Sequence, residues 1–204
     1  MALPFSAPER SLQHRRSIDI EVYARGDGLW EVDAHLSDIR SRDTPLSSGI
    51  CRAGQPIHDL VLRLVVDERF NILEAGSETR AMPFAGQCDE HDDAYARLVG
   101  LNLMQRFRQG LRERVGGVLG CTHITEMAMT LPTAVVQAFA GTVIDTRGHA
   151  VSSERPFQID RCHALRESGE AVRIHFPRWY RAGGTTAQAL PVPSSSQPQQ
   201  ETPR

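Results

Sequence analysis

The chain contains no lysine: all 23 basic residues of its 204 are arginine. This absence excludes a Schiff-base amine, a Walker A lysine beneath a nucleotide phosphate and a lysine general base. Cationic recognition must therefore depend on arginine, whose planar guanidinium suits carboxylates and phosphates.

Net charge and long apolar runs are also scarce. The formal net charge is only -2, and no window approaches the length of a membrane span. The first 16 residues hold no apolar stretch long enough for a signal peptide. We therefore expect a cytoplasmic protein without nucleic-acid or membrane partners.

Cysteine is infrequent, with four residues: Cys51, Cys88, Cys121 and Cys162. Because the cytosol keeps thiols reduced, these residues are expected to be free thiols or metal ligands instead of disulfides. Cysteine is therefore the first place to look for chemistry.

Alternating apolar and polar residues predict two β-hairpins. The first has strands over 18–25 and 30–37, joined by a Gly-Asp-Gly turn, and the second has strands over 58–66 and 70–80. The segment 40–57 between the hairpins has the composition of a loop, either mobile or a lid. The hairpins predict an antiparallel sheet of about four strands, and its uncovered edges make a homodimer plausible.

Downstream of the hairpins, apolar residues change to a helical period. We expect one helix over 92–115 and a second over 122–140, kinked or broken at Pro132. Extended character over 142–180 could add two C-terminal strands. The predicted fold is α+β: a mostly antiparallel sheet packed with two helices. We expect a flexible N-terminus (1–15), one domain (16–181) and a disordered tail (182–204) rich in proline, serine and glutamine.

Four short polar clusters interrupt this pattern, and each contains cysteine, histidine or both. They are His58-Asp59, Cys88, Cys121-Thr122-His123 and Cys162-His163. Thiolates and imidazoles are preferred zinc ligands, so these clusters predict a divalent metal site, with zinc as the first choice. Each residue alone also has a structural explanation, such as a buried thiol or an N-cap.

The same clusters lie in motifs that resemble a bacterial family. The motifs are 25–30 (Arg-Gly-Asp-Gly-Leu-Trp), 56–59 (Pro-Ile-His-Asp), Pro83-Phe84 with Cys88, 120–123 (Gly-Cys-Thr-His), and segments at 156–165 and 177–180. Their order resembles the uncharacterised family known as domain of unknown function 2889, over roughly residues 15 to 181. The resemblance implies a role for the motif residues without implying a reaction.

Three functions are consistent with these residues. The first is a metal-dependent hydrolase or lyase acting on a small carboxylic acid or acyl thioester, with Asp59, Glu126 or His163 as acid or base. Its metal ligands would come from His58, Cys88, Cys121, His123 and Cys162. The second is a metal-free thioester hydrolase with Cys121 as nucleophile and a nearby histidine as base. The third is a non-enzymatic module held together by structural zinc. We favour the first because the clusters mix histidine, cysteine and carboxylate.

Overall fold

The computed structural model describes residues 3, 5–146 and 155–183, and the chain divides into two compact units, Met1–Ile144 and Asp145–Arg204. The division falls inside 16–181, where the sequence predicts a single domain. The predicted tail lies outside the described residues except for 182 and 183. Among the described residues, no helix has the length and apolar character needed to cross a bilayer.

A four-stranded antiparallel sheet forms the centre of the first unit, in the order β1-β2-β5-β6. The strands are β1 (His14–Ala24), β2 (Trp30–Arg40), β5 (Pro56–Val66) and β6 (Ile72–Ala81). Both predicted hairpins and the α+β class are confirmed. In the first turn Gly28 has φ 81°, a conformation that glycine adopts without steric cost. The homodimer expected from open sheet edges stays a prediction.

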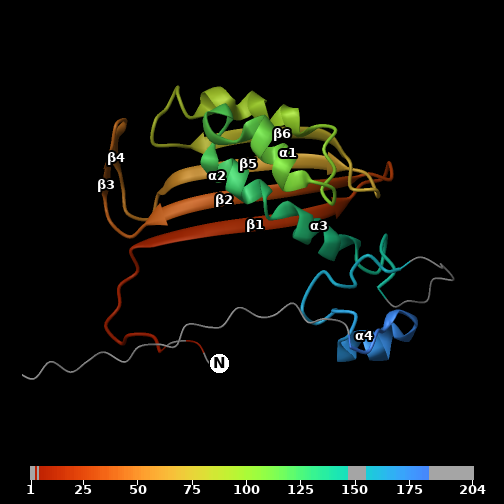
Figure 1. Ribbon diagram of the computed structural model, residues 1–204. Coiled ribbons are helices and arrows are strands. Elements are labelled where there is room, and N and C mark those ends of the chain that lie inside the picture. Colours follow the sequence, from red (N-terminus) through yellow and green to blue (C-terminus); the bar gives the residue numbers. More distant parts are fainter. Residues whose placement is uncertain (1–2, 4, 147–154, 184–204) are drawn as a thin grey trace, which may run out of the picture. The chain divides into compact units, whose positions relative to one another are not determined.

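The segment predicted as a loop contains a third, small hairpin. Its strands are β3 (Thr44–Leu46) and β4 (Gly49–Cys51), which pair with each other in a separate sheet. Figure 1 shows this hairpin at one end of the main sheet.

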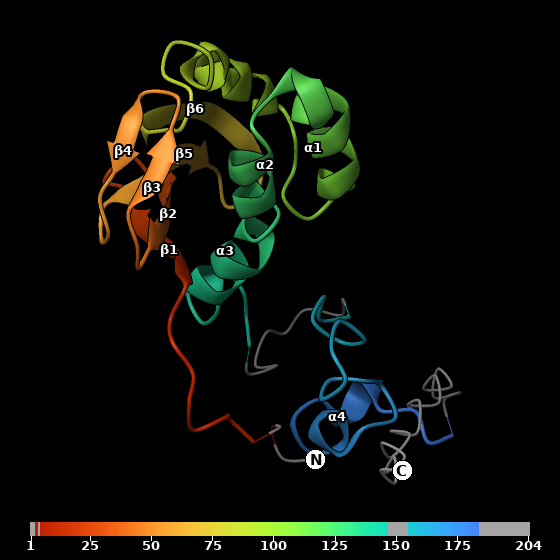
Figure 2. The same cartoon turned by 90° about the vertical axis from the view of Figure 1, so that its left-hand side faces the viewer.

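Helices cover one face of the main sheet (Figures 1 and 2). They are α1 (Phe107–Val115), α2 (Thr122–Ala128) and α3 (Leu131–Phe139), preceded by a 3₁₀ segment, η1 (Asp89–Leu98). Alternate residues of β2 and β5, such as Val32, Ala34 and Leu62, are fully buried against apolar residues of these helices. Burial of this face is the main stabilising contribution, at roughly 25 cal/mol per Å² of apolar surface.

The prediction of one continuous helix over 92–115 is wrong. The chain leaves η1 after Leu98 and is irregular until α1 begins at Phe107. Gly100 adopts φ 84° and donates its backbone N–H to Ile72 O at 2.8 Å, while Leu101 O accepts from Ile72 N at 2.9 Å. Pairing with the start of β6 thus replaces the helical hydrogen bonds of this segment.

The predicted break in the second helix is confirmed. Helix α2 ends at Ala128 and α3 begins at Leu131, so Pro132 lies in the first turn of α3, where its missing N–H leaves no helical bond unmade.

The two predicted C-terminal strands are wrong for the described residues of 142–180. This segment contains a helix, α4 (Glu170–His175), and a 3₁₀ turn, η3 (Pro177–Trp179). Val172 and Phe176, four residues apart, are both buried with Ile159 in the small core of the second unit. In a strand, Ile174 would lie on the same face as Val172 and Phe176 and would be buried with them, but it is 56% exposed. The helical period therefore determines which residues are buried here.

Candidate functional site

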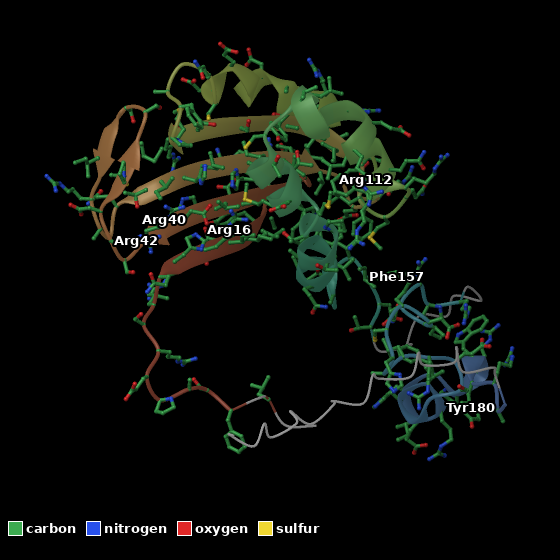
Figure 3. The ribbon with its side chains drawn as sticks, turned by 60° about the vertical axis from the view of Figure 1, so that its left-hand side comes forward. Arg16, Arg40, Arg42, Arg112, Phe157 and Tyr180 are labelled. Carbon is green, nitrogen blue, oxygen red and sulfur yellow. The ribbon has the colours of Figure 1, made fainter. Side chains whose placement is uncertain are left out.

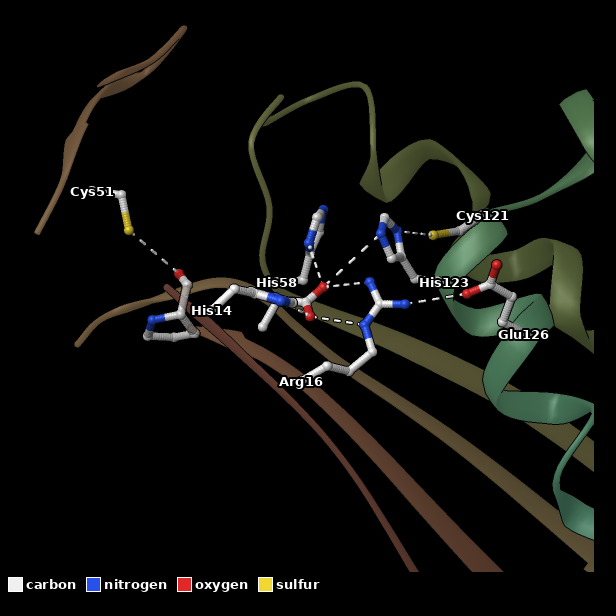
Figure 4. A network of polar contacts seen from close by, with 9 residues as sticks. His14, Arg16, Cys51, His58, Cys121, His123 and Glu126 are labelled. Carbon is white, nitrogen blue, oxygen red and sulfur yellow. Dashed lines mark hydrogen bonds and ion pairs between the residues drawn. The ribbon is translucent and has the colours of Figure 1, made fainter. Parts of the chain in front are cut away.

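The candidate site lies where the buried face of the sheet changes from apolar to polar. On each of β1, β2 and β5, the alternation that places apolar residues toward the helices continues into a polar residue: Arg16, Asp38 and His58 respectively. Arg16 is directly opposite Asp38 in the β1–β2 register, and Asp38 is opposite His58 in the β2–β5 register. The three side chains therefore form a row across the sheet. Figure 4 labels Arg16 and His58, the two ends of this row.

Asp38 is the centre of this row, and its side chain is only 5% exposed. Arg16 binds it with two hydrogen bonds of 2.8 Å, from Nε to Oδ1 and from Nη2 to Oδ2. His14 Nε2 lies 2.9 Å from Oδ1, and His58 Nδ1 lies 3.0 Å from Oδ2. A buried carboxylate is stable only when paired in this way.

These contacts change the acidity of both Asp38 and His58. Burial by itself would raise the pKa of Asp38, but hydrogen bonds from Arg16 and His14 outweigh it and lower the pKa to about 2. Burial and the neighbouring His123 lower the pKa of His58, against the opposing effect of Asp38. The site therefore contains a permanent carboxylate beside an imidazole that favours its neutral, ligating form.

Helix α2 brings His123 to the row. Its ring lies 4.0 Å from the His58 ring between centroids, and its Nε2 lies 4.0 Å from Asp38 Oδ2. Its other ring nitrogen, Nδ1, faces Cys121 Sγ at 3.8 Å. Cys121 is the N-cap residue of α2, with extended backbone angles, and this position is what lets residues 121 and 123 converge.

The start of α2 is held in place by Tyr95, a fully buried residue of η1. Its hydroxyl donates to Cys121 O at 2.8 Å and accepts from Cys121 N at 3.0 Å. Gly120 allows this approach, since a Cβ there would lie 2.8 Å from Val115 O and 3.1 Å from the Tyr95 hydroxyl oxygen. Glycine is thus required at this position by close packing.

Asp38, His58 and His123 could together hold a metal ion, since one ligand atom from each lies within 4.8 Å of the others. A zinc ion about 2.0–2.1 Å from each of three donors holds them about 3.4 Å apart. The observed separations of 3.0 and 4.0 Å from Asp38 Oδ2 bracket that value. The donor set of two imidazoles and one carboxylate suits zinc and other first-row divalent ions.

A pocket of about 440 Å³ opens beside this cluster. Asp38, His58 and His123 line it together with Arg16, Arg40 and Arg42. This volume is in the range of small-molecule sites. The arrangement therefore combines a possible metal centre with space for a small ligand.

A protein-family model, described as "Protein of unknown function (DUF2889)", matches residues 14–137, more than half of the chain. The chain belongs to the DUF2889 family. Comparisons with curated proteins and with solved structures give no match. The residues matched to DUF2889 include β1, β2, β5 and α2, and so every residue of the row and of the possible metal cluster.

The structure separates the remaining predicted site residues. Asp59 belongs to the opposite phase of β5, and it bonds His35 at 2.8 Å. Glu126 lies at the edge of the site, with Oε2 3.2 Å from Arg16 Nη1. Cys88 precedes η1 and is outside the possible metal cluster among the described residues. Cys162 and His163 belong to the second unit, beyond the DUF2889 match.

Sequence reasoning missed Asp38, Arg16 and His14. The sequence did contain a signal for Asp38. Val32, Ala34 and Leu36 are the buried alternate residues of β2, and Asp38 is the next residue in that alternation. The same phase of β1 runs back from Ile20 and Ile18 to Arg16 and His14. A charged residue that continues a buried phase marks a site because its burial requires a partner.

Proposed function

We propose that the protein is a metal-dependent enzyme, a hydrolase or lyase acting on a small carboxylic acid or acyl thioester. A divalent ion, zinc first, binds Asp38, His58 and His123. The observation that carries the proposal is the convergence of these three donors, from β2, β5 and α2, beside a pocket of about 440 Å³. This set replaces the larger His/Cys set predicted from the sequence.

Three protein ligands with an open side are typical of catalytic metal centres, whereas structural zinc is usually enclosed by four. The described residues supply three donors, and the pocket adjoins them. A metal there supplies Lewis acidity, polarising a carbonyl oxygen and lowering the pKa of a bound water.

The surrounding residues orient the ligands. Arg16 fixes the plane of the Asp38 carboxylate through its two parallel hydrogen bonds. His123 would hold the metal through Nε2, which would leave its ring proton on Nδ1, the nitrogen that faces Cys121 Sγ. Arg16 also holds Glu126 at the edge of the site, outside the residues that line the pocket, with Oε2 3.2 Å from Arg16 Nη1.

Elemental analysis tests the proposal directly. The full chain is purified without added metal or chelator, together with Asp38→Asn, His58→Ala and His123→Ala variants. We expect about one zinc or similar ion per wild-type chain and little in the three variants. The matched control is His35→Ala, since His35 is a half-exposed histidine of β2 that bonds Asp59 outside the cluster. A folded wild-type protein that neither contains nor takes up a divalent ion would refute the proposal.

A second function is favoured by one observation, the 3.8 Å contact between Cys121 Sγ and His123 Nδ1. In this alternative Cys121 is the nucleophile of a thioester hydrolase and His123 is its base. A Cys121→Ser variant distinguishes the two functions: it keeps metal and most activity in the first and loses activity in the second. Alkylation at neutral pH provides a further test, because a nucleophilic Cys121 must react faster than Cys51, another partly buried thiol.

A further inference from the structure

The pocket carries more positive charge than its one carboxylate can balance. Three arginines line it, and Asp38 is the only acidic residue among its lining residues. Arg16 is fully engaged, with Nε and Nη2 on Asp38 and Nη1 on Glu126. The excess charge therefore belongs to Arg40 and Arg42.

Arg40 and Arg42 follow Asp38 at intervals of two residues. Arg40 is the last residue of β2 and lies opposite His14 of β1. This pair is two residues along the strands from the Arg16–Asp38 pair, on the same face of the sheet. Arg42 Nη1 donates to Gln13 Oε1 at 2.7 Å, a neutral partner. Within the described part of the chain, neither arginine forms an ion pair with a carboxylate. Figure 3 shows both at the end of the sheet that carries Arg16, whereas Arg112 belongs to α1.

We propose that Arg40 and Arg42 form an oxyanion subsite that binds a carboxylate or phosphate group of the substrate. The planar fork of a guanidinium matches both groups through paired hydrogen bonds. Arg40 is half-buried, so a neutral ligand would cover its charge without compensating it, whereas an oxyanion compensates it. The subsite thus selects an anionic substrate, either a small dicarboxylate or a phosphate-bearing thioester.

This inference rests on the proposed function for the reaction, but the binding of an anion can be measured without the metal. The full chain is stripped of metal with a chelator, dialysed and titrated calorimetrically with inorganic phosphate and, separately, with succinate. The test variant is Arg40→Gln/Arg42→Gln. The matched control is Arg108→Gln/Arg112→Gln, which removes two exposed arginines, one helical turn apart, from α1.

We expect at least one of the two anions to bind wild type and the control alike, and to bind the Arg40/Arg42 variant about tenfold more weakly. Stronger binding of phosphate would indicate a phosphate-bearing substrate, and stronger binding of succinate a dicarboxylate. The inference is overturned if neither anion binds wild type, if the Arg40/Arg42 variant binds as wild type does, or if the control loses as much.

Zinc titration of the same proteins separates this inference from the proposed function. We expect the Arg40/Arg42 variant to bind zinc as wild type does, because neither arginine belongs to the Asp38, His58 and His123 set. If the proposed function is wrong, wild type will bind no zinc but will still bind the anion. If the subsite inference is wrong, the Arg40/Arg42 variant will bind the anion as wild type does, and both proteins will still bind zinc.

Discussion

Replacing Asp38 by asparagine removes the charge at the centre of the site while preserving its shape. In the metal-free protein this change leaves the two parallel hydrogen bonds of Arg16 and the contacts of His14 and His58 without a carboxylate. We expect Asp38→Asn to lower the free energy of unfolding at pH 7 even when no metal is present.

The magnitude follows from the acidity of Asp38. Its pKa falls from 3.8 to about 2 in the folded protein. At about 1.36 kcal/mol per pKa unit, the fold favours the carboxylate over the neutral form by about 2 kcal/mol. Because the folded-state pKa is the lower one, this contribution is complete above the unfolded pKa and is lost as the pH falls through about 2.

Urea unfolding of chelated and dialysed protein at pH 7 and at pH 2 measures this effect. The matched control is Asp33→Asn, because Asp33 also lies on β2 and accepts two 2.6 Å bonds from one arginine, Arg63. The Asp33 side chain is 25% exposed and that of Arg63 56%, so the control should cost less than about 1 kcal/mol. Equal losses in the two variants at pH 7, or a loss from Asp38→Asn that persists at pH 2, would refute the reasoning.

Three further substitutions test the packing that supports the site. Phe139→Ala should lower the free energy of unfolding, measured in urea, by about 3–5 kcal/mol. The Phe139 ring is fully buried, and its centroid lies 4.8 Å from that of the Trp30 ring. A loss below about 1 kcal/mol would contradict the burial of this ring in the core. Tyr95→Phe should cost about 1–3 kcal/mol by removing the acceptor of the Cys121 N–H, and should weaken zinc binding in calorimetry. Gly120→Ala should cost about 1–3 kcal/mol in thermal or urea unfolding, since its Cβ would lie 2.8 Å from a backbone oxygen; unchanged stability would show that the backbone adjusts freely.

The sheet was predictable because its signals are local. The apolar phase of β2, which includes Val32 and Ala34, and the glycines of the first turn are visible within about twenty residues of sequence. The helical segments were less predictable. Gly100 ends the helical pattern because its peptide group pairs with Ile72, nearly thirty residues away, and a local period contains no information on such a bond.

Two of the three residues of the possible metal cluster were predictable from the sequence. His58 and His123 stand out as metal-ligating residue types, and Cys121 approaches His123 because it precedes the first turn of α2. Asp38 was missed because the predicted strand ended at residue 37, one residue before the aspartate that continues its apolar phase. Asp59, adjacent to His58, lies in the opposite phase of β5, since successive residues of a strand point to opposite faces.

The sequence by itself determined which residues alternate, which segments turn and that every permanently cationic side chain is an arginine, because these properties belong to neighbouring residues or to composition alone. Only the tertiary structure decided that Arg16, Asp38 and His58 form one row and that α2 brings His123 to it. Strand register and helix docking are set by burial of the whole apolar face, a property that no single segment contains.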